Sequence, residues 1–107
     1  TLRDLNKLVV DYYTRELPKH GLTKDVSEYY FHGVSHHLGL DTHDVNIGNA
    51  PLVAGNVITN EPGLYIEDEN IGIRIEDDLL ITGTGATILS SDVPKEIADI
   101  ERIAARS

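Results

Sequence analysis

The segment IGIRIEDDLLIT, residues 71–82, begins with a strict alternation that limits this part of the chain to a β-strand. Isoleucines at every second position alternate with Gly72, Arg74 and Glu76. Because successive side chains of a strand point to opposite faces, the pattern predicts one apolar face and places Arg74 and Glu76 together on the other. That pair is either a solvent-exposed ion pair, which contributes little to stability, or part of a functional site.

Helical periodicity occurs on both sides of this strand. Apolar residues recur every three or four positions over residues 2–13, and Pro18 ends the predicted helix. A short helical stretch is expected at about 24–30. A last helix is expected to start at Pro94, with its cap one or two residues earlier. Its apolar stripe would consist of Ile97, Ile100, Ile103 and Ala104.

Short strands complete the expected fold. Residues 57–59 and 64–66 are typical of extended segments around the turn-forming Pro62 and Gly63, and the Gly-rich TGTGA further on predicts a β-hairpin. The element order is helix, His-rich segment, strands and helix. This order predicts one α+β domain over residues 1–107, with a mainly antiparallel sheet and helices on one face.

The composition argues against several classes of partner. With 40% hydrophobic and 25% charged residues, the chain is typical of a soluble globular domain. Its 18 acidic and 9 basic residues give a formal charge of −9, which argues against nucleic acid and anionic membranes and favours cations. No run of about 18 apolar residues predicts a membrane span. The absence of cysteine fits a cytoplasmic location.

The segment FHGVSHHLGLDTHDV concentrates four of the five histidines, His32, His36, His37 and His43. Imidazole is the commonest metal ligand and titrates near neutral pH, so this cluster indicates a metal or catalytic site. The spacing does not identify the metal, and the glycines and a missing Glu argue against the helical H-E-x-x-H motif. His37 is expected to face away and to be structural, and the isolated His20 to be an ordinary surface or core residue.

Glu61 lies directly before Pro62, whose ring biases the preceding residue toward extended geometry. A carboxylate at the end of a strand and beside a rigid turn is suited to be a fixed ligand or base, although an isolated Glu before a turn is usually a surface residue. Together with the histidines and the pair of Arg74 and Glu76, it predicts a hydrolytic metal site.

Three segments, HGVSHHLGLDTHDV, NVITNEPGLYI and GIRIEDDLLIT, closely resemble in this order the C-terminal motifs of the Xaa-Pro aminopeptidases, also called aminopeptidase P. The resemblance runs from about Phe31 to Thr82 and more loosely through VPKEIADIE. It implies the C-terminal half of a pita-bread (creatinase/aminopeptidase-like) fold, in which helices cover a curved, mainly antiparallel sheet.

The resemblance also implies a dinuclear metal centre. His36 resembles its single imidazole ligand, Glu61 a ligand that also acts as the general base, and Glu76 the carboxylate that bridges both ions. By family habit the two divalent ions would be manganese. The oxygen-rich donor set would also admit cobalt, iron or zinc.

Three further residues acquire roles through the resemblance. His43 resembles a histidine that hydrogen-bonds the substrate around the scissile bond, and His32 resembles a second pocket histidine. Arg74 would be an outer cation that steadies the carboxylates, which explains why it stands beside Glu76 on one strand face.

One part of the family pattern has no match in this sequence. The family's centre takes two further Asp ligands and another His from its first half, and nothing before Phe31 resembles that segment. The chain is therefore expected to be the C-terminal part of a longer peptidase, with the upstream half of the domain as its partner. The 107 residues alone are expected to have little or no activity, and exposed apolar surface could pair in a homodimer.

The activity implied is the release of an N-terminal residue that precedes proline in a peptide substrate. Two alternatives stay open. Prolidase shares the site but takes only dipeptides and usually has Gly where this chain has Ser35, which favours aminopeptidase P. A non-catalytic pita-bread binding module is disfavoured because His36, Glu61 and Glu76 are retained.

Overall fold

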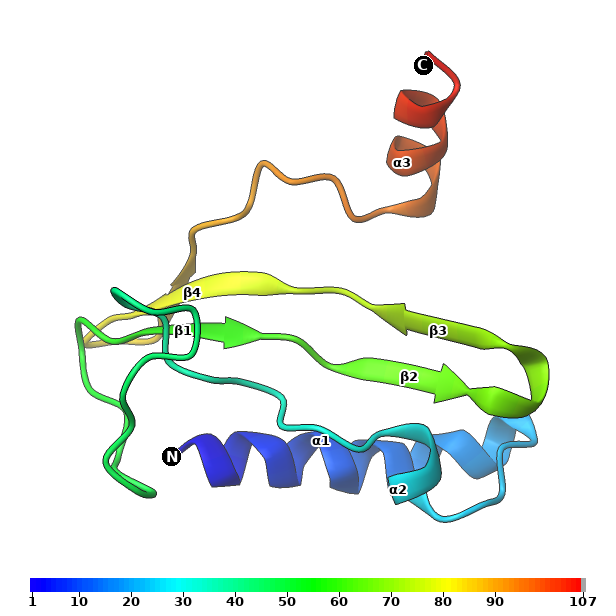
Figure 1. The fold of residues 1–107 in the computed structure, drawn as a ribbon, viewed down its shortest axis with the longest axis horizontal. Coiled ribbons are helices and arrows are strands. Elements are labelled where there is room, and N and C mark those ends of the chain that lie inside the picture. The colour runs from blue at the N-terminus through cyan, green and yellow to red at the C-terminus, as the bar shows by residue number, and fades with distance from the viewer. Residues whose placement is uncertain (107) are drawn as a thin grey trace.

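The computed structural model describes residues 1–106, and two long antiparallel arms run through its centre (Figure 1). The predicted α+β class is confirmed. In chain order the elements are α1 (Leu2–Glu16), the 3₁₀ helix η1 (Leu17–His20), α2 (Val26–Tyr29), β1 (Val57–Asn60), β2 (Gly63–Ile66), the 3₁₀ helix η2 (Glu67–Glu69), β3 (Ile71–Arg74), β4 (Asp77–Ile81), β5 (Ala86–Ile88) and α3 (Ile97–Ala104).

Each arm consists of two strands in a row. β1 and β2 are separated only by Glu61 and Pro62, and β3 and β4 only by Ile75 and Glu76. β1 pairs with β4 and β2 pairs with β3, both antiparallel, while β5 adds the predicted hairpin on β4. The register is the same on both sides of the interruption, so Glu61 lies opposite Glu76 and Pro62 opposite Ile75.

Residues 71–82 do not form the single uninterrupted strand that the sequence predicts, so that prediction is wrong at Ile75 and Glu76. β3 ends and β4 begins on either side of these two residues. Pro62 explains the interruption, because it has no N–H to donate and lies opposite Ile75. The chain therefore forms two short sheets, with a gap in the ladder between them.

α1 and α2 lie along one face of the arms, as predicted (Figure 1). α1 starts at a capping box between Thr1 and Asp4 and continues into η1, which ends at Gly21 in the left-handed conformation (φ 81°). The Tyr13 hydroxyl donates to the Gly63 carbonyl at 3.0 Å. This bond attaches α1 to the first residue of β2, directly after the interruption.

The interior lies where the extended segment 34–38 runs beside β1. Backbone hydrogen bonds join the two at alternate positions, and His37 forms a β-bridge with Ile58. β1 is therefore covered on both edges, and Ile58 and Thr59 are only 1% exposed. The other buried side chains are Leu17, Tyr29, Tyr30 and Val34.

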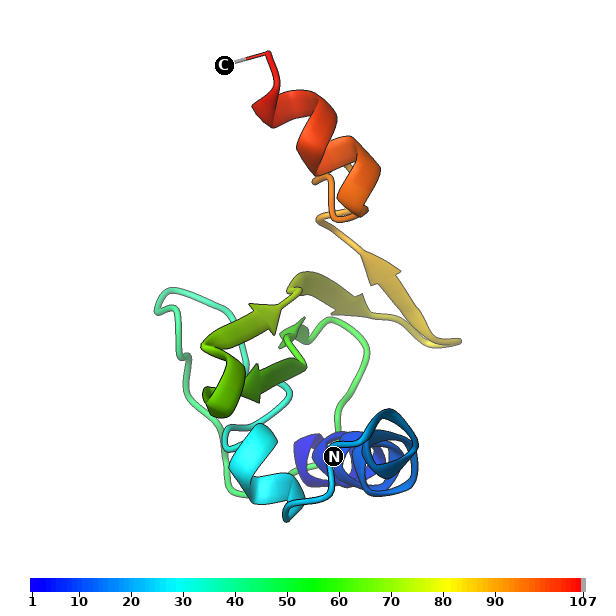
Figure 2. The ribbon, with the colours of Figure 1, turned by 90° about the vertical axis from the view of Figure 1, so that its right-hand side faces the viewer.

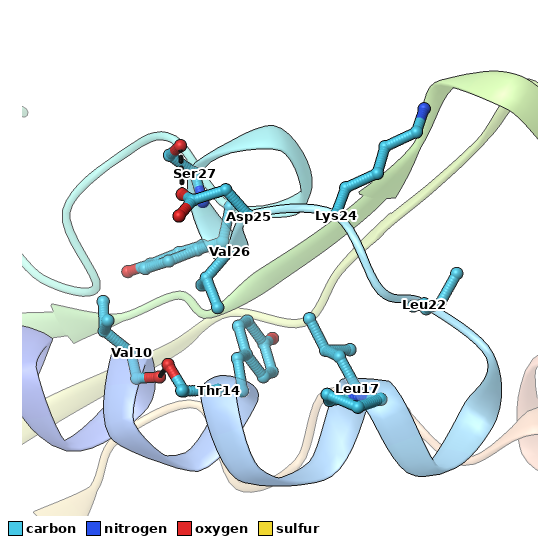
Figure 3. Close-up of a pocket in the computed structure, with 11 residues that line it drawn as sticks. Val10, Thr14, Leu17, Leu22, Lys24, Asp25, Val26 and Ser27 are labelled. Atoms are coloured by element: carbon cyan, nitrogen blue, oxygen red, sulfur yellow. Dashed lines mark hydrogen bonds between the residues drawn. The ribbon is translucent and has the colours of Figure 1, made fainter.

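A cavity of about 400 Å³ opens between α1 and α2 (Figure 3). Val10 and Leu17 line it from the α1 side, and Val26 of α2 points toward them. Asp25 caps α2 by accepting from the backbone N–H and the hydroxyl of Ser27. α2 is thus fixed at its start and packs on α1 around this cavity.

α3 stands away from the arms at the end of an extended segment (Figures 1 and 2). It begins at Ile97, with Glu96 as its cap, and not at Pro94, so the predicted start is wrong. Lys95 pairs with the Asp77 carboxylate on β4 and holds this segment against the sheet, which delays the helix. The apolar stripe is 50–76% exposed and comprises Ile97, Ile100 and Ile103.

The apolar face of β3 is also exposed. Ile71, Ile73 and Ile75 are 48%, 61% and 47% exposed, so nothing within residues 1–106 buries the face that the alternation predicts to be buried. Over the same residues, no helix has both the length and the apolar character needed to cross a membrane.

Candidate metal centre

The junction between the two sheets brings two carboxylates together. Glu61 follows β1, Glu76 precedes β4, and the common register places them opposite each other. Like charges directly across an antiparallel pair repel. A cation between them would turn this repulsion into attraction, so the pair is suited to bind positive charge.

His36 reaches these carboxylates from the segment beside β1. Its Nδ1 donates to the His37 carbonyl at 3.0 Å, because a carbonyl oxygen can only accept. Nε2 then carries a lone pair, and it lies 3.2 Å from Oε1 of Glu61. Two acceptors at this distance need a proton or a metal ion between them. A carbonyl bonded to the far nitrogen is also the usual way in which a metal-binding imidazole is oriented.

The three predicted metal ligands converge. One ligand atom each from His36, Glu61 and Glu76 lies within 4.8 Å of the others. This spacing fits side chains that share one ion or bridge two neighbouring ions, which lie about 3.5–4 Å apart in two-metal sites. One imidazole with two carboxylates suits divalent ions such as manganese, cobalt and zinc. The residues present therefore fit a metal centre.

Arg74 lies between the two carboxylates. Its Nε is 3.7 Å from Oε2 of Glu61 and 3.8 Å from Oε2 of Glu76. The Glu61 side chain is only 12% exposed, whereas the Arg74 side chain is 50% exposed. Arg74 and Glu76 are thus not an isolated surface pair, because the same guanidinium also faces the largely buried Glu61.

Thr59 is a site residue that the sequence reasoning missed. Its buried hydroxyl accepts from the His36 backbone N–H at 3.0 Å and donates to Oε1 of Glu61 at 3.1 Å. Its backbone N–H donates to the His36 carbonyl at 2.9 Å. One side chain therefore positions two predicted ligands. A local signal existed, because Thr59 precedes Glu61 by two positions and so shares its strand face.

A cavity of about 630 Å³ opens beside the ligands. His32, His43 and Arg74, which the sequence analysis assigns to the pocket, all line it. The His43 and His36 rings are 4.3 Å apart between centroids. Tyr65 also lines the cavity and was missed, because nothing in its local sequence indicates a contact with His32.

The two remaining histidines do not line this cavity. His37 forms the bridge to Ile58 beside β1, in agreement with the predicted structural role. His20 is exposed at the end of η1 and is an ordinary surface residue. Of the five histidines, the structure therefore brings three to the site.

Tyr30 lies behind the site and is strongly shielded from water. Burial raises its pKa to about 12, with smaller electrostatic contributions from Tyr13, Glu61 and Tyr65. The Tyr30 hydroxyl donates to Oδ1 of Asn6 at 2.8 Å, and the same oxygen accepts from the Val34 N–H at 3.1 Å. Asn6 thus connects α1 to the start of the segment that carries His36.

Comparison with known proteins places this geometry in a family. Residues 1–83 match the sequence model of metallopeptidase family M24. The chain is 48% identical over 88 residues to the Xaa-Pro aminopeptidase of Haemophilus influenzae, an alignment that covers 71% of this chain and 20% of the relative. It is 41% identical over 118 residues to the mitochondrial intermediate cleaving peptidase 55 of Arabidopsis thaliana, and this alignment covers 96% of this chain and 24% of the relative.

A solved structure shares the fold. Zinc-substituted aminopeptidase P of Escherichia coli, in complex with product, superposes with a TM-score of 0.79 at 36% identity. The match covers 99% of this chain and 29% of that chain. The chain thus spans between 20% and 29% of the length of these relatives. The pita-bread expectation and the resemblance read from the three motifs are confirmed, and the chain belongs to metallopeptidase family M24.

Proposed function

We propose that residues 1–107 are the C-terminal part of the catalytic domain of a dinuclear-metal Xaa-Pro aminopeptidase. The enzyme would release the N-terminal residue that precedes proline in a peptide. The observation that carries this proposal is the convergence of His36, Glu61 and Glu76 within 4.8 Å at the junction of the two sheets. The family match and the names of the relatives support it.

His36, Glu61 and Glu76 would hold the divalent ions. When bound, such ions lower the pKa of a water molecule and polarise the scissile carbonyl. We propose manganese as the native metal, since one imidazole among oxygen donors suits a hard-to-borderline ion. Zinc or cobalt would also bind, and the Escherichia coli relative has been solved with zinc.

The side chains of this chain would divide the chemistry among them. The Glu61 carboxylate would take a proton from the attacking water as the water oxygen bonds to the scissile carbonyl carbon. The same proton would pass to the proline nitrogen as the C–N bond breaks. His43, on the cavity side of His36, would donate a hydrogen bond to the substrate. Thr59 and Arg74 would hold Glu61 in position.

Three ligands are fewer than a dinuclear centre needs, so the upstream half of the domain would supply the rest. The exposed isoleucines of β3 and α3 support this proposal, because an apolar surface of this kind normally packs against another part of the protein. We therefore expect little or no activity from residues 1–107 alone. A homodimer through the same surface is the alternative, and light scattering at two concentrations distinguishes it from a monomer.

The names of the relatives favour aminopeptidase P over prolidase, because both curated relatives described above are peptidases of the Xaa-Pro aminopeptidase or intermediate cleaving type. The retained ligands argue against a non-catalytic binding module. We propose a cytoplasmic location. The absence of cysteine fits the cytoplasm, whereas the Arabidopsis thaliana relative is named as mitochondrial, and cell fractionation would decide.

The test is a peptidase assay of the full-length protein after removal and return of manganese. An Xaa-Pro-Xaa tripeptide should lose its first residue, whereas an Xaa-Ala-Xaa tripeptide and an Xaa-Pro dipeptide should react far more slowly. Glu61→Gln should abolish the reaction, and Glu69→Gln, an exposed control in η2, should not change it. Cleavage of only the dipeptide would support prolidase, and no cleavage by a metal-loaded protein would contradict the proposal.

A further inference from the structure

The ring of Tyr65 packs against the backbone of two glycines, Gly63 and Gly72. Tyr65 pairs directly with Gly72 across β2 and β3, and Gly63 lies two positions earlier on the same strand face. A Cβ atom at Gly72 would lie 2.9 Å from Cδ1 of Tyr65, and one at Gly63 would lie 2.5 Å from its hydroxyl oxygen. Neither position could carry a side chain unless the ring moved.

In this position the Tyr65 hydroxyl contacts His32. The hydroxyl oxygen is 2.8 Å from Nε2 of His32, and Nδ1 of His32 is 2.9 Å from the Gly33 carbonyl. Because a carbonyl can only accept, Nδ1 carries the hydrogen and Nε2 is the acceptor. The Tyr65 hydroxyl is then the donor, and both nitrogens of a neutral imidazole are occupied.

Neighbouring rings restrict the same pair. Phe31 packs on Tyr65 with centroids 4.9 Å apart, and Tyr30 meets the His32 ring edge-on, also at 4.9 Å. Tyr65 and His32 both line the cavity that contains Glu61. The Tyr65 hydroxyl is thus placed to fix the orientation and the tautomer of His32. His32 forms part of the cavity wall, beside the residues that would bind metal and substrate.

We propose that Tyr65 is a positioning residue that holds His32 in its Nδ1–H tautomer as a fixed wall of the substrate cavity. This proposal rests on the peptidase function proposed above. It assigns His32 the role of shaping the cavity, because the imidazole has no free N–H to offer to a substrate while Tyr65 donates to it. Gly63 and Gly72 are the residues that give the tyrosine ring room to do so.

Kinetics of the full-length enzyme give the first test. Tyr65→Phe keeps the ring and removes the donor, so KM for an Xaa-Pro tripeptide should rise about fivefold, the equivalent of one neutral hydrogen bond, while kcat stays within about twofold. Tyr12→Phe removes the hydroxyl of an exposed tyrosine that does not line this cavity and should change neither constant. Gly72→Ala should raise KM as Tyr65→Phe does, whereas Gly85→Ala, where a Cβ meets open space, should not.

A measurement that does not depend on activity separates this proposal from the proposed function. Nitrogen NMR of the full-length protein with ¹⁵N-histidine, assigned through His32→Gln, should show His32 protonated at Nδ1 and unprotonated at Nε2. Tyr65→Phe should shift the Nε2 signal, and Tyr12→Phe should not. An Nε2–H tautomer in the wild type, or unchanged His32 signals and KM in Tyr65→Phe, would overturn the proposal. Failure to cleave Xaa-Pro peptides would instead reject the proposed function.

Discussion

Replacement of Thr59 by Val tests how the site is held together. Valine keeps the volume and the branching of threonine but cannot accept from the His36 N–H or donate to Glu61. Because Thr59 is only 1% exposed, water cannot replace the lost partner in the folded protein. The buried His36 N–H would be left without an acceptor, and Glu61 would lose one donor.

The expected cost follows from these two losses. An orphaned buried N–H costs about 1–3 kcal/mol, and a hydrogen bond to a charged group contributes about 1.5–3 kcal/mol. Glu61 retains Arg74 nearby, so we expect Thr59→Val to lower the free energy of unfolding of the metal-free protein by about 3 kcal/mol in total. Loss of an outer hydrogen bond to a ligand should also weaken metal binding about 10- to 100-fold.

Urea denaturation and metal titration measure both effects. Thr59→Ser is the matched control, because it keeps the hydroxyl and removes one buried methyl group, at a cost of about 1 kcal/mol. The serine variant should therefore lose some stability but keep its metal affinity, and the valine variant should lose both. Valine at wild-type stability and affinity, or serine as weak in metal binding as valine, would refute the reasoning.

Three further predictions concern pH and association. The Lys95 ammonium and the Ser90 hydroxyl hold the pKa of Asp77 below its ordinary 3.8, so its stabilising effect is present above that value and is lost as pH falls through the lowered pKa. Below the ordinary pKa of a carboxyl group, the urea midpoint of Asp77→Asn should therefore depend less on pH than that of the wild type. Equal pH dependence of the two proteins would contradict this. Burial raises the pKa of Tyr30 to about 12, so the folded state gains stability from it below about pH 10 and loses that gain as pH rises toward 12. Tyr30→Phe should remove this alkaline dependence, as followed by circular dichroism. Residues 1–107 alone should bind a fluorescent probe of apolar surface through the isoleucines of β3, and Ile73→Thr should weaken the fluorescence. Equal fluorescence of the wild type and Ile73→Thr would argue against an uncovered apolar face.

The convergence of His36, Glu61 and Glu76 was predictable because each lies in a short motif that resembles a known family. The interruption at Ile75 was not predicted, because Ile75 continues the alternation of residues 71–76 and the cause lies in Pro62 on the opposite arm. The sequence pattern of one strand does not indicate which residues of the paired strand lie opposite it. A missing N–H on a neighbouring strand is therefore invisible until the register is known.

Other differences also arise from contacts between distant residues. The start of α3 depends on the pairing of Lys95 with Asp77, which lies 18 positions earlier in the chain. Tyr65 depends on Gly72, which is opposite it only because η2 joins β2 and β3 in this register. Thr59 was the nearest miss, since its spacing from Glu61 put it on the correct face. Local patterns thus predicted most of the elements, and the family resemblance indicated the three candidate ligands and Arg74, but neither indicated Thr59 or Tyr65.

The most direct test of the proposed metal site is a calorimetric titration of the metal-free full-length protein with manganese and with zinc. Wild type should bind two ions per chain, and His36→Ala and Glu76→Ala should each lose at least one of them. The exposed control Glu69→Gln should match the wild type. Full uptake of both ions by the His36 and Glu76 variants would show that these side chains do not hold the metal, and the proposed centre would be wrong.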